Sequence, residues 1–316
     1  MNPNSRIPLF LALTLSLTLS FAQAPILWTS SWSPDGAHIL VGGDDGILRV
    51  YDGSTFELLR RDTLSADHPI LRMDWHPKEN VVAIGMGGPE LYFLNFDNGE
   101  QKTITGYAGC SRGIGWNHNG KLLAAGDGEG VIHIWTRKGK HLRSMDKGDT
   151  KSYVGLDWHP HKNQLIGISQ YIWRYNHRGK LLQLTQHREE EVLLLCLQWH
   201  PSGDFYILGD YGDTNVPHPA VLQLWKDDGT RLHQFWGSEG PYRNIRWSPD
   251  GSMLATASDA LRIRSAKGAL LFTGESPDLL WGVDWSPDQR YIITSSQEGR
   301  VKLWDNKAKL LKDLER

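Results

Sequence analysis

Residues 280–305 read LWGVDWSPDQRYIITSSQEGRVKLWD and contain the pattern that decides the fold. A short apolar stretch ends at Trp285 and runs into a turn made of Ser, Pro and Asp. Two further apolar stretches follow, over 291–296 and 301–305, and a Gly-containing turn separates them. Short apolar stretches bounded by such turns are typical of β-strands. The segment therefore predicts three antiparallel strands, and residues 308–315 supply a fourth.

The same unit recurs along the whole chain. A tryptophan followed by a turn occurs seven times, at intervals of 38 to 48 residues. These tryptophans are Trp32, Trp75, Trp116, Trp158, Trp199, Trp247 and Trp285. Each one ends the first strand of a unit whose four strands we name a to d in chain order. Because large aromatic side chains in register are best buried between sheets, we expect them to pack in the core.

The repeat predicts the architecture. One four-stranded sheet cannot bury both of its faces, whereas seven such sheets packed face to face around an axis can. The sequence thus predicts an all-β fold, a seven-bladed β-propeller of four-stranded antiparallel blades. It shows no apolar 3.6-residue periodicity of useful length, which excludes the α/β classes, and a two-sheet sandwich would not need seven equal units. We expect a single domain over 25–316.

The repeated unit resembles that of WD-repeat proteins. Trp304-Asp305 is the dipeptide that names the family, and WSPDG at 32–36 and 247–251 is typical of its turns. The resemblance covers 26–316 and implies the same propeller. The family's Gly-His pair before strand a is absent from every repeat, which leaves its His–Ser/Thr–Asp–Trp hydrogen-bonded tetrad in question. Each blade is contiguous in the sequence, so we expect closure between blades 7 and 1 to rest on side-chain packing.

Residues 1–24 have the pattern of a secretory signal peptide. Arg6 precedes an uncharged, mostly apolar run over 7–21, and Ala22-Gln23-Ala24 matches the small-x-small cleavage pattern. The run is shorter than the roughly 20 apolar residues that a membrane-spanning helix needs. We therefore expect a secreted or periplasmic protein that is cleaved after Ala24 and has no membrane span afterwards.

Composition and motifs exclude several classes of function. The 316 residues carry 34 Lys and Arg against 36 Asp and Glu, and this net charge of −2 disfavours a generally basic nucleic-acid binder. The sequence motifs of serine hydrolases, P-loop nucleotide binders and zinc proteases are absent. We interpret the histidines of the Trp-His-Pro sequences, His76, His159 and His200, as turn residues rather than metal ligands. We expect no enzymatic activity, no cofactor and no bound metal.

Charged residues are distributed unevenly over the predicted loops. In the resembled fold the d–a loops and the b–c turns lie on one face, which we call the top. By our assignment these segments hold 19 acidic and 5 basic residues. An acidic face of this kind attracts a basic partner. Blade 5 also has the longest b–c connection, 210–220, and loop length that a fold does not need often serves function.

The sequence thus favours a non-catalytic scaffold that binds a protein or peptide, preferably a basic one, on its acidic top face. Acidic loop residues would attract the partner, and aromatic and Arg side chains near the top ends of strand a would anchor it. The candidate contacts are Trp28, Arg112, Tyr153, Glu189, Glu190, Glu191, Tyr211, Asp213, His218, Trp236, Tyr242, Arg243 and Trp281. Two alternatives remain open. One is a calcium-dependent, lactonase-like hydrolase with its site at the channel mouth. The other is a small-molecule or glycan receptor that stacks its ligand on Trp28 and Trp281.

Overall fold

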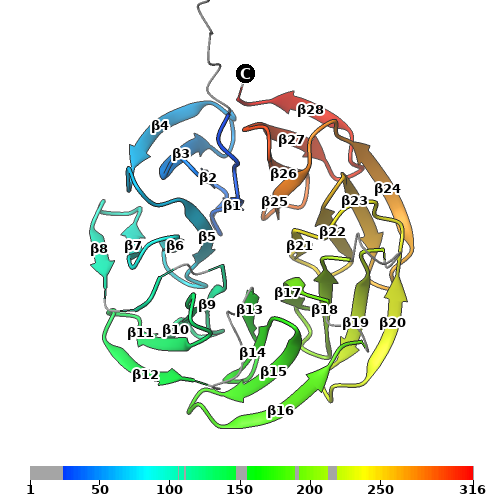
Figure 1. The fold of residues 1–316 in the computed structure, drawn as a ribbon. Helices are drawn as coiled ribbons and strands as arrows, with labels where there is room; N and C mark the ends of the chain where they lie inside the picture. The colour runs from blue at the N-terminus through cyan, green and yellow to red at the C-terminus, as the bar shows by residue number, and fades with distance from the viewer. Residues whose placement is uncertain are drawn as a thin grey trace, which may run out of the picture.

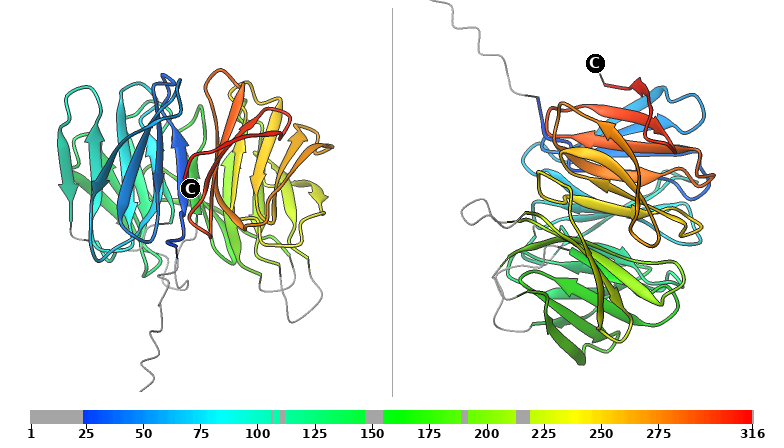
Figure 2. Two further views of the ribbon diagram at one scale, coloured as in Figure 1. Left: turned by 90° about the horizontal axis from the view of Figure 1, so that it is seen from above. Right: turned by 90° about the vertical axis from the view of Figure 1, so that its right-hand side faces the viewer.

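Seven four-stranded antiparallel sheets surround a central axis, as the sequence predicts (Figure 1). The computed structural model describes residues 24–105, 107–109, 112–146, 155–188, 192–212 and 219–315. All regular elements in this part of the chain are strands. The predicted signal peptide lies outside the described residues, apart from Ala24. The sheets form a single ring, and the loops gather on its two opposite faces (Figure 2).

Each blade uses four consecutive strands, so strand order in every sheet follows chain order. The innermost strands, which end at the repeated tryptophan, are β1 (Thr29–Trp32), β5 (Ile70–Trp75), β9 (Ile114–Trp116), β13 (Gly155–Trp158), β17 (Leu194–Trp199), β21 (Asn244–Trp247) and β25 (Leu280–Trp285). The second strands are β2 (His38–Gly42), β6 (Val81–Met86), β10 (Leu122–Gly126), β14 (Gln164–Ile168), β18 (Phe205–Asp210), β22 (Met253–Ala257) and β26 (Tyr291–Ser296). The third strands are β3 (Ile47–Asp52), β7 (Leu91–Asn95), β11 (Ile132–Thr136), β15 (Tyr171–Asn176), β19 (Leu222–Lys226), β23 (Ala260–Ser265) and β27 (Val301–Asp305). The outermost strands are β4 (Leu58–Thr63), β8 (Gln101–Ile104), β12 (His141–Met145), β16 (Leu181–Gln186), β20 (Arg231–Phe235), β24 (Leu270–Glu275) and β28 (Leu310–Asp313).

The turn after each tryptophan is built by local side-chain hydrogen bonds. In blade 1, Ser33 Oγ donates to Asp35 Oδ1 at 2.6 Å and accepts the His38 N–H at 2.9 Å. Gly36 has a φ of +77°, a backbone conformation that a glycine adopts at little cost. The serine and aspartate of the turns at 247–251 and 285–289 make the same contacts. Hydrogen bonds between residues close in the sequence therefore determine where strand a ends and strand b begins.

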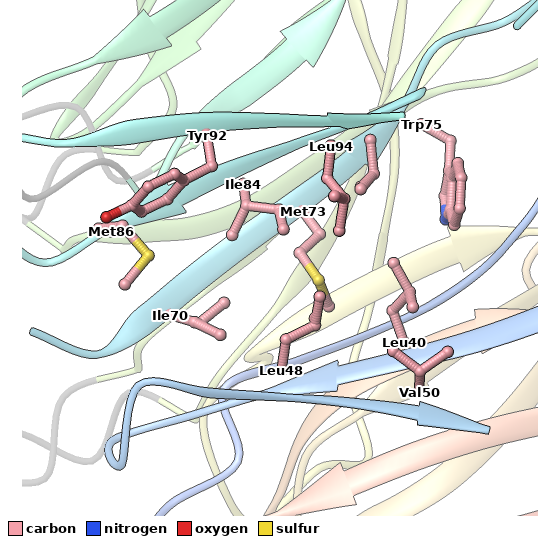
Figure 3. Close-up of a cluster of buried hydrophobic side chains, with 11 residues drawn as sticks. Leu40, Leu48, Val50, Ile70, Met73, Trp75, Ile84, Met86, Tyr92 and Leu94 are labelled. Carbon is pink, nitrogen blue, oxygen red and sulfur yellow. The ribbon is translucent and has the colours of Figure 1, made fainter. Parts of the chain in front are cut away.

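The hydrophobic core lies between neighbouring blades. Figure 3 shows the cluster that joins blades 1 and 2, where Met73 lies among the side chains of Leu48, Ile84 and Leu94. Met73, Leu48 and Ile84 are completely buried. Burial of such a side chain stabilises the fold by roughly 1.5–3 kcal/mol. Six further interblade or intrablade clusters of this kind complete the described core.

A second contact joins adjacent blades at the wall of the central channel. The side chain one residue before the repeated tryptophan accepts the backbone N–H of the tryptophan in the next blade, a contact that we call the interblade clip. The clips are Asp74 with Trp116 at 2.7 Å, Asp157 with Trp199 at 2.8 Å, Gln198 with Trp247 at 2.6 Å and Asp284 with Trp32 at 2.8 Å. The last of these joins blade 7 to blade 1.

Closure of the ring uses more than side-chain packing, so that part of the sequence-based expectation is incomplete. Besides the interblade clip, the Leu27 N–H donates to the Ser296 carbonyl at 3.0 Å. Glu315, which follows β28, accepts hydrogen bonds from Arg61 at 2.9 Å and from the Tyr51 hydroxyl at 2.5 Å. Blades 7 and 1 are thus held together by backbone and charged contacts as well as by apolar side chains.

Candidate functional site

Equivalent residues from six blades meet where the central channel opens on the top face. Each lies four residues before the repeated tryptophan, and together they form what we call the mouth ring. Its members are Trp28, Leu71, Arg112, Leu195, Arg243 and Trp281. The equivalent position in blade 4 lies outside the described residues. With Arg72 of β5, the mouth ring lines a small cavity of about 30 Å³.

Cation–π contacts hold the mouth ring together. The rings of Trp28 and Trp281 meet edge to face, with centroids 4.4 Å apart. The guanidinium carbon of Arg112 lies 4.4 Å from the Trp28 ring centroid, and that of Arg243 lies 4.0 Å from the Trp281 centroid. The guanidinium carbon of Arg243 also lies 5.1 Å from the ring centroid of Tyr211, which follows β18. Since guanidinium groups prefer aromatic faces, these contacts fix both arginines at the channel mouth.

Below the mouth ring, the channel encloses a polar cavity of about 220 Å³. Carboxylates of three interblade clips line it, and burial raises the pKa of Asp74 to about 7 and that of Asp157 to about 6. Burial also raises the pKa of Asp284, whose Oδ1 lies 3.7 Å from Arg246 Nε. Arg72 lies between this cavity and the mouth, and burial lowers its pKa to about 10. It therefore remains a cation at neutral pH.

The geometry offers no candidate metal centre in the described part of the chain. There, no three His, Cys, Asp or Glu side chains come close enough to hold one ion. Asp74, Asp157 and Asp284 instead use an oxygen each in the interblade clips. The calcium-dependent alternative therefore has no ligand set among these residues.

Blade 3 contains a chain of hydrogen bonds that the sequence did not suggest. Asp127 Oδ2 lies 2.8 Å from His133 Nε2, and His133 Nδ1 lies 3.0 Å from Ser144 Oγ. This is the connectivity of a nucleophile, a base and an orienting acid. In blade 1, Arg49 occupies the position of His133 and forms an ordinary ion pair with Asp45 of the b–c turn, at 2.6 Å. We therefore interpret the blade 3 chain as a structural contact within the blade.

Acidic residues of the top loops are partly paired within the protein. Among the residues that the structure describes, at least seven of these acids have a basic side chain within ion-pair distance, counting histidine partners. These pairs are Asp45–Arg49, Asp62–Arg60, Glu90–His68, Asp127–His133, Asp210–Arg188, Asp259–Arg262 and Asp278–Lys302. Seven others are exposed, namely Asp44, Asp67, Glu129, Asp146, Glu239, Glu275 and Glu298. Pairing reduces the acidic field that loop composition alone predicts.

Several predicted contact residues come together, and others do not. Trp28, Arg112, Tyr211, Arg243 and Trp281 converge at the channel mouth, as described above. Tyr242 is completely buried in a core cluster of blades 5 and 6, so its prediction as a surface contact is wrong. Trp236 is 54% exposed but follows β20, the outermost strand of its blade, and is not part of the mouth ring. The remaining predicted contacts lie outside the described residues, namely Tyr153, Glu189, Glu190, Glu191, Asp213 and His218.

Sequence reasoning missed three residues of the mouth, Leu71, Leu195 and Arg72. A usable signal was present, because the mouth ring is found by counting back four residues from each repeated tryptophan. Loop position and side-chain chemistry alone do not distinguish these two leucines from leucines of the core. Arg72 lies one position further along its strand and reaches the mouth from the channel side.

Comparison with known proteins agrees with the repeat. The family model described as "WD domain, G-beta repeat" matches four stretches of the chain, at residues 15–52, 99–136, 229–261 and 268–305. The protein "Cell division cycle 20.1, cofactor of APC complex" of Arabidopsis thaliana is 24% identical over 77% of this chain and 54% of its own length. "Telomerase Cajal body protein 1" of Mus musculus is 22% identical over 91% of this chain and 56% of its own length. "Intraflagellar transport protein 80 homolog" of Mus musculus is 22% identical over 64% of this chain and 25% of its own length.

The chain spans about half the length of the first two of these relatives and a quarter of the third. Their similarity supports the repeat and the propeller, and their full activities belong to longer proteins. No helix among the described residues has the length and apolar character needed to cross a membrane.

Proposed function

We propose that this chain is a WD-repeat propeller that acts as a non-catalytic scaffold and binds a protein or peptide on its top face, at the channel mouth. The observation that carries the proposal is the mouth ring. It presents two tryptophans and two arginines, which are among the residue types that most often dominate the affinity of protein interfaces. Tyr211 extends this surface outward and is 42% exposed.

The comparisons support the same kind of function. One relative is named as a cofactor of a complex and another as a transport protein, and neither printed name describes catalysis. Among the described residues, the hydrogen-bonded chain Asp127–His133–Ser144 of blade 3 has the connectivity of an acid, a base and a nucleophile. An ion pair takes its place in blade 1, so we interpret the chain as structural. A protein-binding role without catalysis is therefore the function that the geometry supports best.

An acidic top face remains part of the proposal as a means of attracting the partner. The exposed acidic residues of the d–a loops and b–c turns would increase the rate at which a basic surface approaches. Glu189, Glu190 and Glu191 would add to this field. Their reversal to lysine should slow association with such a partner at low ionic strength, and an unchanged on-rate would contradict this part of the proposal.

The glycan-receptor alternative is less well supported. A sugar stacks on a free aromatic face, whereas Trp28 and Trp281 pack edge to face against each other. Each of them also has a guanidinium group over its ring, at 4.4 Å and 4.0 Å respectively. An arginine therefore already occupies one face of each ring.

Export is proposed on the pattern of residues 1–24 alone. Expression of the full chain, followed by N-terminal sequencing of the secreted or periplasmic fraction, tests it. A mature protein that begins at Pro25 would support export, and an intact N-terminus in the cytoplasmic fraction would contradict it.

Affinity capture tests the scaffold. The tagged protein is compared with a Trp28→Ala/Trp281→Ala variant and with Trp236→Ala, an exposed tryptophan outside the mouth ring, after circular dichroism has shown that all three are folded. We expect a partner that wild type and Trp236→Ala retain and that the double variant loses. Retention by all three would contradict a site at the mouth, and loss only in Trp236→Ala would move the site to the loop after β20.

A further inference from the structure

Histidines fill three of the interblade junctions on the bottom face, which we define as the face of the a–b and c–d turns. Each is the residue after the repeated tryptophan, and it lies against a glycine in the turn of the next blade. The pairs are His76 with Gly120, His159 with Gly203 and His200 with Gly251. Nε2 of His76 and of His200 lies 2.9 Å and 3.0 Å from the carbonyl oxygen of that glycine. Each ring also packs on the tryptophan of the next blade, with centroids at 5.0, 4.6 and 4.9 Å.

Side-chain amides fill three other junctions. There the residue after the tryptophan is serine or asparagine, and an amide side chain in the turn of the next blade reaches back to the preceding turn. The contacts are Asn80 with Asp35 at 3.1 Å, Asn163 with Asn117 at 2.8 Å and Gln289 with Asp250 at 2.9 Å. A histidine or an amide therefore bridges every junction except that of blades 7 and 1, and the turns at all seven belong to the described residues.

The junction of blades 7 and 1 has the glycine of a histidine pair without the histidine. Ser286 stands at the histidine position, and Gly36 stands at the receiving position. The nearest atoms to a Cβ added at Gly36 belong to Pro287, at 3.9 Å, whereas a Cβ at Gly120 would lie 2.0 Å from His76. A pocket of about 280 Å³, which we call the junction pocket, occupies this place.

Aromatic side chains line the junction pocket. The ring centroids of Phe56 and Tyr291 lie 6.3 Å and 6.5 Å from that of Trp32, farther than the histidine rings lie from the equivalent tryptophans. The Gly36 carbonyl oxygen accepts the Trp32 indole N–H at 3.3 Å. Because a carbonyl oxygen has two lone pairs, it can accept a second N–H from a ligand. The pocket thus offers the aromatic surface and the acceptor that a histidine uses at the filled junctions.

Phe56 has a backbone conformation that is unusual for its side chain. Its φ is +61°, in the left-handed region that bulky residues rarely occupy. The equivalent residue of the c–d turn is alanine in blade 7 and glycine in the five other blades, namely Gly99, Gly139, Gly179, Gly229 and Gly268. Strained residues of this kind persist where the surroundings hold them, and they are found at ligand sites. The turn therefore does not explain a phenylalanine here, whereas a pocket wall does.

We propose that the junction pocket binds a histidine side chain of a protein partner, which takes the place of the histidine that this junction lacks. The imidazole ring packs on Trp32 and Phe56, and its Nε2–H donates to the Gly36 carbonyl oxygen. The junction pocket lies on the face opposite the mouth ring. The inference therefore goes beyond the proposed function and adds a second binding surface to the propeller.

Saturation-transfer difference NMR on the purified chain tests the inference with blocked Gly-X-Gly peptides, in which X is His, Nε2-methylhistidine, Asn or Ala. We expect saturation of the imidazole protons of the His peptide. Methylation should weaken binding about threefold or more, because it removes the N–H donor, and the Asn and Ala peptides should bind more weakly than the His peptide. Equal binding of the two histidine peptides, preference for Asn or Ala, or no binding of the His peptide up to about 10 mM would overturn the inference.

Variants of the pocket locate the site. Ser286→His supplies the missing side chain from the chain itself, so it should abolish binding of the His peptide and raise the unfolding temperature by about 2 °C or more. The turn accommodates a histidine, since Nδ1 accepts the backbone N–H two residues further on in each of the three histidine turns. Phe56→Gly removes an aromatic wall and suits the left-handed φ, and should weaken binding about threefold or more.

The matched control is Lys267→His, which adds a histidine at an exposed c–d turn of blade 6 and should change affinity less than about twofold. Binding that Phe56→Gly leaves unchanged would overturn the junction pocket, whether or not Ser286→His folds. The inference and the scaffold proposal can fail separately. Trp28→Ala/Trp281→Ala should retain full binding of the His peptide, and loss in that variant would place the peptide at the mouth ring and overturn the inference.

Discussion

Asp74 lies in the channel wall and accepts the Trp116 N–H, and burial raises its pKa to about 7. The folded state therefore holds a proton on this carboxyl group over a range in which the unfolded chain, with an ordinary value of 3.8, has lost it. The stability that this group contributes is complete below about pH 4 and is lost as the pH rises toward 7. A neutral amide at this position would remove that dependence.

We expect the stability of the Asp74→Asn variant, relative to wild type, to be greater at pH 8 than at pH 5. The difference in unfolding free energy should change by about 2–3 kcal/mol between the two pH values. An amide fits, because Gln198 occupies the equivalent position in blade 5 and accepts the Trp247 N–H at 2.6 Å. Urea unfolding at both pH values measures the change, with Asp67→Asn at an exposed loop as control. Parallel stability curves for wild type and Asp74→Asn would contradict the expectation.

At the scale of single residues, the sequence did not predict the direction in which each side chain points. Arg243 and Tyr242 are neighbours near the start of β21, and both were expected at the surface. Successive side chains of an extended segment point to opposite sides, so one reaches the channel mouth and the other the core. The pairing of top-face acids was missed for a related reason. Their partners, such as Arg49 and Arg262, come from the third strand of the blade and not from the loops that were counted.

At the scale of elements, the histidine after the tryptophan joins one blade to the turn of the next. His76 Nε2 lies 2.9 Å from the Gly120 carbonyl oxygen, and His200 Nε2 lies 3.0 Å from that of Gly251. These contacts agree with the interpretation of His76 and His200 as turn residues, whereas His159 Nε2 makes no such hydrogen bond and lies 3.9 Å from Asp227 Oδ1. The sequence indicated the turn, and the structure adds the contact with the neighbouring blade, which no local pattern could reveal.

We expect Gly120→Ala to destabilise the fold much more than Gly99→Ala. The two glycines have nearly equal φ values, +72° and +71°, so the backbone strain is the same. A Cβ at 120 would lie 2.0 Å from the buried His76 ring, whereas a Cβ at 99 has open space around it. The additional cost should be roughly 1–3 kcal/mol, measured by thermal or urea unfolding.

Removal of the histidine ring should reverse part of this effect. The double variant Gly120→Ala/His76→Ala should lose less stability than the sum of the two single variants, because the clash is gone. Additive effects would show that strain in the turn, and not the contact between blades, determines the cost.

At the scale of the whole molecule, the closing junction of blades 7 and 1 carries the same interblade clip as the junctions of blades 2 and 3, 4 and 5, and 5 and 6. We expect Asp284→Ala, which opens the junction of blades 7 and 1, to cost about as much stability as Asp157→Ala between blades 4 and 5. Each leaves a buried backbone N–H without its acceptor, at roughly 1–3 kcal/mol. Both variants should still unfold in one transition, as followed by calorimetry and hydrogen exchange. Early exchange confined to blades 1 and 7 in Asp284→Ala would show that the closing junction is weaker.

The number of blades, their strand order and the turns were predictable because each depends on residues close together in the chain. The mouth ring depends on where equivalent positions of six blades meet in space, and this follows from the repeat only after the ring is closed. A repeat identifies each member of such a site separately, and the closed fold shows which members touch.

Because every blade is contiguous and the two described ends meet at the junction of blades 7 and 1, the ring has no structurally preferred starting point (Figure 1). Chain order can then be changed without a change in contacts, since permutation is tolerated where the original ends are close and the new ends lie in exposed loops. A circular permutant that begins before β5, ends after β4 and carries a short linker between the original ends should form the same propeller with the same channel mouth. In this protein the seven-fold arrangement of blades, rather than the order in which they are synthesised, determines the surface that a partner meets.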